Sequence, residues 1–188
     1  MTGPVEPLQS GSLAGRLVVA TASLVDPTFH LTAALLLEHG EHGALGVVLN
    51  RPSEIPVDQV LPDWSCAVSE PRVVFHGGPV QPNTVIAVAR SSVEAPSGWQ
   101  RVLGSLGVVD LDADPAIVTP DMAGLRVFAG YAGWAAGQLE AEISRGAWFV
   151  LDAGHDDPFC RDPDELWRGV LRRQGGLFTT VSTNPTLN

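Results

Sequence analysis

Short apolar runs separated by glycine, proline and aspartate recur along the chain, and they predict more strands than helices. The predicted strands are Gly15–Thr21, Leu31–Glu38, Ala44–Leu49, Val73–His76, Val85–Ala89, Gly107–Leu111, Leu125–Gly130 and Ala147–Leu151. The second and third runs enclose Gly40 and Gly43, which predicts a β-hairpin. Pro52 should end the hairpin, because proline has no N–H to donate to a strand ladder.

Two later segments have the spacing of amphipathic helices. The first, Trp134–Arg145, carries an apolar stripe and a polar stripe, formed by Ala135, Leu139 and Ile143 and by Trp134, Gln138 and Glu142. The second begins at Asp162, a suitable N-cap before Pro163, and ends at the glycines 175–176. A single helical turn is expected at Val57–Leu61.

Because the strands outnumber the helices and do not alternate regularly with them, we predict an α+β fold rather than a doubly wound parallel sheet. The first twelve residues are rich in glycine, proline and serine, which predicts a disordered tail. Residues 13–188 are then expected to form one domain, since 188 residues suit a single ordinary core.

The composition excludes several kinds of chemistry. All eleven basic residues are arginine, so lysine Schiff bases and a P-loop lysine are excluded. A net charge of −10 without a basic stripe argues against direct binding to nucleic acid. The chain start does not resemble a signal peptide, and the apolar stretch Leu31–Leu37 is far shorter than the ~20 residues of a membrane span. We therefore predict a cytoplasmic protein that does not bind membranes.

Two clusters of polar residues could be taken for metal sites. Glu38, His39 and His42 lie where the hairpin should turn, so we favour a polar hairpin tip over a site with incomplete ligand spacing. Residues 152–162 are rich in aspartate and include His155 and Cys160, but they match no EF-hand loop. We favour an acidic loop that precedes a helix, where carboxylates interact well with the helix dipole. No metal, cofactor or catalytic residue is predicted.

The stretch GYAGWAAGQLEAEISRGAW, residues 130–148, is the most informative part of the sequence. Its three glycines allow close backbone packing where a strand turns into a helix. Tyr131 and Trp134 lie beside Gln138 and Glu142. The stretch is compatible with a tightly packed strand–helix joint and equally with a pocket that has an amide and a carboxylate at its rim.

This stretch resembles the signature of the YqgE/AlgH family of bacterial proteins, and other motifs agree with it in order from Leu13 to Gly175. They are Gly15-x-Leu17-Val18-Val19-Ala20, Leu24-x-Asp26-Pro27-x-Phe29, Glu38-His39, Gly43 through Pro52, Gly77-Gly78-Pro79-Val80 and Asp164 through Gly175. The segment after Gly78 departs from the family pattern, because it reads VIAVAR at residues 85–90 in place of a Leu-His ending. The loop from Asp152 to Cys160 also matches no family pattern.

The resemblance implies an α+β fold with a branched, partly barrel-like and mostly antiparallel sheet flanked by helices. Members of the family are often called transcriptional regulators, but the resemblance implies no catalytic or DNA-reading residue. We therefore predict a non-enzymatic binding or regulatory protein that binds a small molecule or a protein partner. The alternative is an enzyme with a pocket built around His39, Asn50 and Glu142.

The candidate ligand-binding residues lie at the hairpin ends, the glycine turn and the strand–helix joint, where turns at strand ends gather at sheet edges. They are His39, Asn50, Arg51, Gly77, Gly78, Tyr131, Trp134, Gln138 and Glu142. We expect them to converge on one surface.

Overall fold

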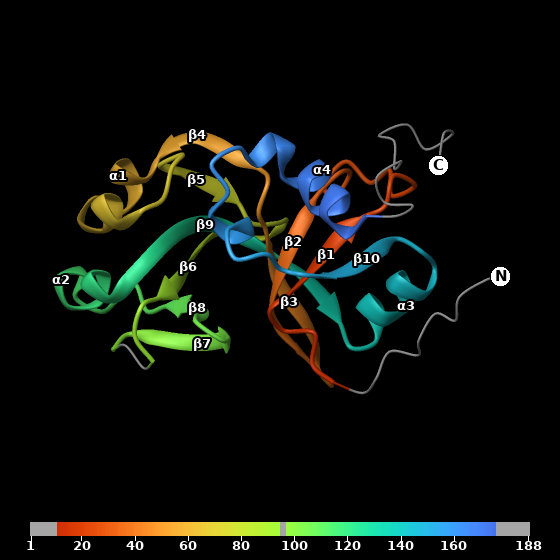
Figure 1. Ribbon diagram of the computed structural model, residues 1–188, viewed down its shortest axis with the longest axis horizontal. Helices are drawn as coiled ribbons and strands as arrows, with labels where there is room; N and C mark the ends of the chain where they lie inside the picture. Colours follow the sequence, from red (N-terminus) through yellow and green to blue (C-terminus); the bar gives the residue numbers. More distant parts are fainter. Residues whose placement is uncertain (1–10, 95–96, 176–188) are drawn as a thin grey trace.

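Ten strands form one strongly curved sheet in the computed structural model, which describes residues 11–94 and 97–175 (Figure 1). The strands are β1 (Arg16–Ala20), β2 (Ala33–Gly40), β3 (Gly43–Val48), β4 (Pro52–Pro56), β5 (Val73–His76), β6 (Val80–Ser91), β7 (Trp99–Leu103), β8 (Leu106–Val109), β9 (Met122–Ala135) and β10 (Trp148–Asp152). The main path runs β10-β1-β2-β3-β9-β6-β8-β7. β4 and β5 branch from it at β9, and β5–β9 is the parallel pair among the described ladders.

Four short helices and three 3-10 turns flank the sheet. They are α1 (Val57–Val60), η1 (Pro62–Ala67), α2 (Pro115–Val118), η2 (Thr119–Asp121), α3 (Gln138–Ser144), η3 (Asp157–Phe159) and α4 (Pro163–Gln174). No helix among the described residues has both the length and the apolar character needed to cross a bilayer. The architecture confirms the predicted α+β class and the branched, partly barrel-like sheet.

The sheet bends into two halves that share β9. One half carries β1, β2, β3 and β10 with α3 and α4, and the other carries β6, β7 and β8 (Figure 1). Residues on the concave face, among them Leu35, Val47, Val88 and Phe128, form the largest buried cluster. The halves also touch at the tip of the β7–β8 hairpin, because a Cβ added to Gly15 would lie 2.5 Å from the Leu103 side chain.

The hairpin β2–β3 forms as predicted, and so does the helix after Asp162, although the Asp162 side chain makes no capping hydrogen bond. The predicted start of the earlier helix is wrong. β9 continues to Ala135, and α3 begins only at Gln138 after Gly137 adopts φ 74°. The reason is pairing: β3 forms a ladder with residues 132–135 of β9 and holds them extended.

The predicted tail, residues 1–12, lies outside the described part of the chain except for Gly11 and Ser12. The Ser12 hydroxyl donates to the carbonyl oxygen of His39 at 2.9 Å. β4 and β7 were not predicted, because both are polar, half-exposed strands without an apolar run.

Candidate functional site

The nine predicted site residues fall into three groups, two of which lie at opposite ends of the β2–β3 hairpin. In the third group, Gly77, Gly78 and Tyr131 lie where the chain before β6 crosses β9. His39 lies opposite Ala44 at the turn end, together with Trp134, which also pairs with Ala44. Asn50 lies at the other end, where its Oδ1 accepts from the Ala33 amide. Six positions of β2 separate residues 33 and 39, a span of about 20 Å in an extended strand. The predicted convergence on one surface is therefore wrong.

In the first group, Glu142 is held by three side-chain donors. Its Oε2 accepts from Trp134 Nε1 at 3.1 Å and from Trp148 Nε1 at 2.8 Å, and its Oε1 accepts from Gln138 Nε2 at 2.9 Å. The two indoles are buried and pack edge-on against each other and around Phe29. The carboxylate thus ties α3 to β9 and β10.

His39 contacts Glu140 rather than Glu142. Its Nε2 donates to Glu140 Oε1 at 2.8 Å, while its Nδ1 accepts from the Leu13 amide at 3.2 Å. Both ring nitrogens are therefore engaged in joining the chain start, β2 and α3.

The second group has backbone partners. Asn50 is buried, and its Nδ2 donates to the carbonyl oxygen of Leu31, a residue with φ 55°. Arg51 donates to the carbonyl oxygens of Asn50 and His30, and burial lowers the pKa of its guanidinium against the raising effect of Asp164. These side chains hold the 30–33 turn against the end of β3.

Gly77 and Gly78 bring the chain before β6 against β9. The Gly77 amide donates to the Ala129 carbonyl oxygen, and its own carbonyl oxygen accepts from Val48. A Cβ on Gly78 would lie 2.2 Å from the backbone carbon of Tyr131. The glycine turn is thus a close backbone crossing among β3, β6 and β9.

These contacts do not support an enzyme built around His39, Asn50 and Glu142, because Asn50 lies at the far end of the hairpin from His39, and His39 contacts Glu140 rather than Glu142. Among the described residues, no group of three or more His, Cys, Asp or Glu side chains is placed to hold a metal ion. In the acidic loop, Asp157 instead forms a bidentate pair with Arg173, at 2.9 and 2.6 Å, which raises the pKa of that guanidinium.

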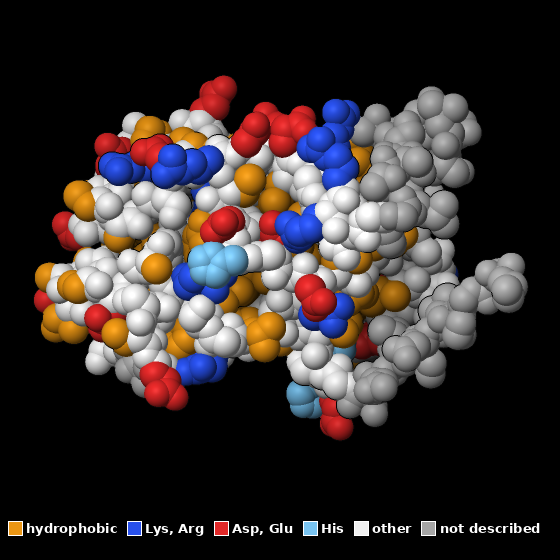
Figure 2. All heavy atoms as spheres, in the orientation of Figure 1, with side chains coloured by type: hydrophobic (Ala, Val, Ile, Leu, Met, Phe, Trp, Pro, Cys, Tyr) orange, Lys and Arg blue, Asp and Glu red, His pale blue; other side chains and the backbone are white. Residues whose placement is uncertain are grey.

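A cavity of about 160 Å³ lies on the concave face, between the two halves. We call it the bulge cavity, and its lining residues are Leu37, Glu38, Leu45, Ile86, Gln100, Arg101, Val102 and Val108. Figure 2 shows hydrophobic side chains between the half with β7 and β8 and the half with β3. None of these lining residues was predicted to bind a ligand, although Glu38 belonged to the metal alternative at the hairpin tip.

Two β-bulges face each other across this cavity. The β2–β3 register shifts between Leu36 and Glu38, which makes Leu37 the extra residue. The β7–β8 register shifts between Arg101 and Leu103, which makes Val102 the extra residue. Bulges bend strands and re-aim side chains, and they are common beside binding sites.

Ladder register decides which polar groups face the cavity. Glu38 pairs with Leu45, and Gln100 pairs with Val108, so each polar side chain shares a face with a lining residue of the partner strand. Among the described residues, neither the Glu38 carboxylate nor the Gln100 amide has a side-chain partner.

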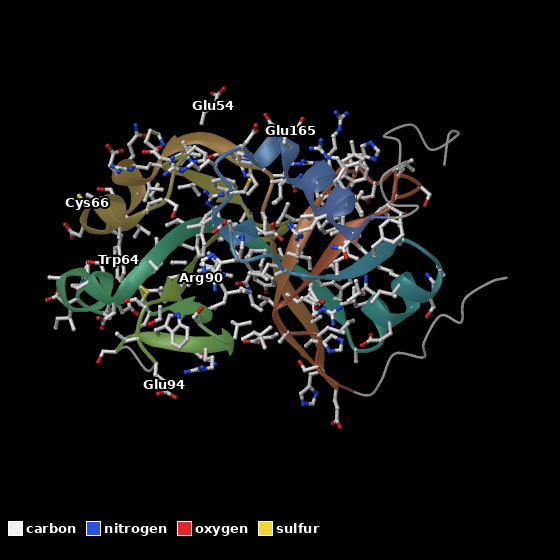
Figure 3. The ribbon with its side chains drawn as sticks, in the orientation of Figure 1. Glu54, Trp64, Cys66, Arg90, Glu94 and Glu165 are labelled. Carbon is white, nitrogen blue, oxygen red and sulfur yellow. The ribbon has the colours of Figure 1, made fainter. Side chains whose placement is uncertain are left out.

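Arg90 and Arg126 lie farther along the same concave face, beneath η3. Arg126 is fully buried, donates to the carbonyl oxygens of Cys160 and Glu70, and lies 4.3 Å from the centre of the Phe75 ring. Burial lowers its pKa to about 10. Arg90, near the middle of the molecule in Figure 3, donates to the His155 carbonyl oxygen. Both guanidiniums hold the 155–160 segment on the sheet.

Known proteins match this chain along nearly its whole length. A sequence profile of the AlgH-like family matches residues 17–179. A UPF0301 protein of Streptomyces coelicolor is 49% identical over 93% of each chain, and one of Mycobacterium leprae is 42% identical over 96% of this chain and 92% of its own.

Two solved structures share the fold. The crystal structure of a protein from Corynebacterium diphtheriae is 33% identical, with a TM-score of 0.87 over 97% of this chain and 95% of that one. The solution structure of the AlgH protein from Pseudomonas aeruginosa is 30% identical, with a TM-score of 0.68 over 94% of this chain and 93% of that one. None of these names states a biochemical activity.

Proposed function

The chain belongs to the AlgH-like family. Since the names of the relatives given above state no activity, we propose its function from the site itself. The protein is a cytoplasmic, non-enzymatic binding protein whose ligand occupies the bulge cavity. The observation that carries this proposal is a largely apolar cavity of about 160 Å³ between two bulged strands. Ligand sites are typically concave and mostly apolar, with a few polar groups that orient the ligand.

The cavity volume limits the ligand. An apolar protein cavity of about 150 Å³ holds a benzene-sized molecule. The bulge cavity therefore fits one six-membered ring or a short branched hydrocarbon, either as a whole ligand or as the apolar end of a larger one. Leu37, Leu45, Ile86, Val102 and Val108 supply the apolar contacts.

We propose that the three residues of the enzyme alternative do not catalyse a reaction, because each already has hydrogen-bond partners within the fold. Glu142 accepts a hydrogen bond from Trp148, His39 donates one to Glu140, and Asn50 accepts one from the Ala33 amide. A general base needs a free lone pair within hydrogen-bond reach of its substrate. We therefore place the regulatory role, which the family resemblance implies, in ligand binding and in contacts with a protein partner.

Binding of benzyl alcohol, a neutral probe of the right size, tests the proposal. Changes in amide chemical shifts during titration should map to residues around the bulge cavity. Val102→Phe fills the cavity and should abolish these shifts, whereas Val25→Phe makes the same change at a side chain that is 69% exposed and should leave them intact. Shifts confined to other surfaces, or equal shifts in both variants, would refute this site.

Regulation without direct contact to DNA has its own test. A net charge of −10 repels phosphates, so duplex DNA should not bind at physiological salt. Fluorescence anisotropy with promoter fragments from the source organism should show no saturable binding. Nanomolar affinity that survives competitor DNA would overturn this part of the proposal.

A further inference from the structure

We propose that the bulge cavity selects a small hydrophobic amine, with its hydrocarbon body between Leu37 and Val102 and its ammonium group at the Glu38 carboxylate. This inference rests on the proposed function and names the class of ligand. It follows from which charged group is free and lies on the cavity side of its strand.

Glu38 is the free charge. Its ladder partner Leu45 lines the cavity, and side chains of directly paired residues lie on the same face of a sheet. The next residue, His39, points to the opposite face, where it contacts Glu140 on α3. Glu38 has no ion pair or side-chain hydrogen bond among the described residues, so its carboxylate is available to a ligand.

Arg101 also borders the cavity, but its guanidinium makes hydrogen bonds to backbone carbonyl oxygens. Its Nη1 donates to the Gly104 carbonyl oxygen at 2.8 Å, and its Nη2 donates to the Glu94 carbonyl oxygen. The guanidinium lies 5.5 Å from the centre of the Trp99 ring, and Trp99 belongs to the core of the convex side. Arg101 keeps its positive charge, but two of its N–H groups are donated to these carbonyl oxygens rather than to a ligand in the cavity.

The remaining polar group at the cavity is neutral. Gln100 pairs with Val108 on the cavity face, and its amide can accept from an ammonium or donate to a neutral group. A cation with an apolar body therefore satisfies Glu38 and Gln100 together, whereas a carboxylate would face Glu38 as a like charge. The overall charge of −10 also favours cations near the surface.

Three probes of nearly equal size test the inference: benzylamine, benzyl alcohol and benzoate. Titrations followed by amide chemical shifts at pH 7 and low salt should place benzylamine first, about fivefold or more tighter than the alcohol, and benzoate last. This ratio reflects the modest strength of a partly exposed ion pair. Raising the salt concentration should reduce the advantage of the amine and leave the alcohol unchanged.

Glu38→Gln should remove the preference for the amine while the alcohol binds as before. Glu41→Gln is the matched control, because it removes one exposed charge from the same hairpin at a residue that does not line the cavity. Equal binding of amine and alcohol to the wild type, or an unchanged preference in Glu38→Gln, would overturn the inference and leave the proposed cavity standing. Failure of all three probes to shift cavity residues would instead remove the proposed function.

Discussion

Removing the Glu142 carboxylate should destabilise this protein far more than its place on a half-exposed helix face indicates. Glu142→Ala leaves the indole N–H groups of Trp134 and Trp148 without an acceptor, and both side chains are less than 7% exposed. A buried donor without a partner costs about 1–3 kcal/mol. Two such donors give about 2–6 kcal/mol, and water that reaches the space left by Glu142 reduces this to about 2–4 kcal/mol.

The assay is urea unfolding followed by far-UV circular dichroism, since tryptophan fluorescence would respond to the substitution itself. A thermal melt gives a second measure of the same loss. For a chain of this size, each kcal/mol lowers Tm by about 2–4 °C, so Tm should fall by on the order of 10 °C. Gln138→Ala is the comparison, because it removes an exposed amide from the same network. It should cost about 0.5–1 kcal/mol.

Glu142→Gln separates the hydrogen bonds from the charge. Its amide oxygen still accepts from the indoles, so most of the stability should return, less about 1 kcal/mol for the lost charge assistance. The reasoning is refuted if Glu142→Ala is no more destabilising than Gln138→Ala. The carboxylate would then be a solvated helix residue that makes no net contribution to packing.

Three further outcomes are expected. Asn50→Asp should cost at least about 2 kcal/mol in chemical unfolding, because it places a charge in a buried site and removes the donor to the Leu31 carbonyl oxygen; a stability equal to the wild type would contradict this. Gly78→Ala should prevent folding, as judged by circular dichroism, because its Cβ would overlap the β9 backbone, whereas Gly40→Ala, with no atom within 4 Å of the added Cβ, should fold normally. Burial lowers the pKa of Arg126 to about 10, so the native state releases this proton before the unfolded chain does. The unfolding free energy of the wild type relative to Arg126→Met should therefore be level below about pH 9 and rise above about pH 10; a difference that falls with rising pH would reverse the assigned sign.

The elements marked by local signals were predictable from the sequence. The β2–β3 hairpin has apolar runs around two turn glycines, and the last helix has proline at its start and glycine at its end. The end of β9 was not, because Gly130 and Gly133 indicate a turn into a helix. What keeps this segment extended is its pairing with β3, a contact distant in sequence.

The same limit applies to the candidate site. The conspicuous polar residues, His39, Asn50 and Glu142, could be named from the sequence, but their partners could not, and the partners give them structural roles. The bulge cavity is lined by ordinary residues such as Leu37 and Val102. They line a cavity because the strand ladders shift register at these two residues, and the register depends on how the strands pair.

The shared strand β9 has a consequence for how the molecule comes apart. β9 pairs with β6 along Met122–Tyr131 and with β3 along Ala132–Ala135. Each half therefore needs this strand to complete its part of the sheet. We expect one cooperative unfolding transition, and amide exchange in the middle of β9 that proceeds only through global opening. Gly130, at φ 69°, is the residue of β9 in the left-handed region. A side chain at this position would strain the backbone beside the point where β9 leaves its ladder with β6 and enters its ladder with β3, so such a substitution would weaken the junction of the two halves.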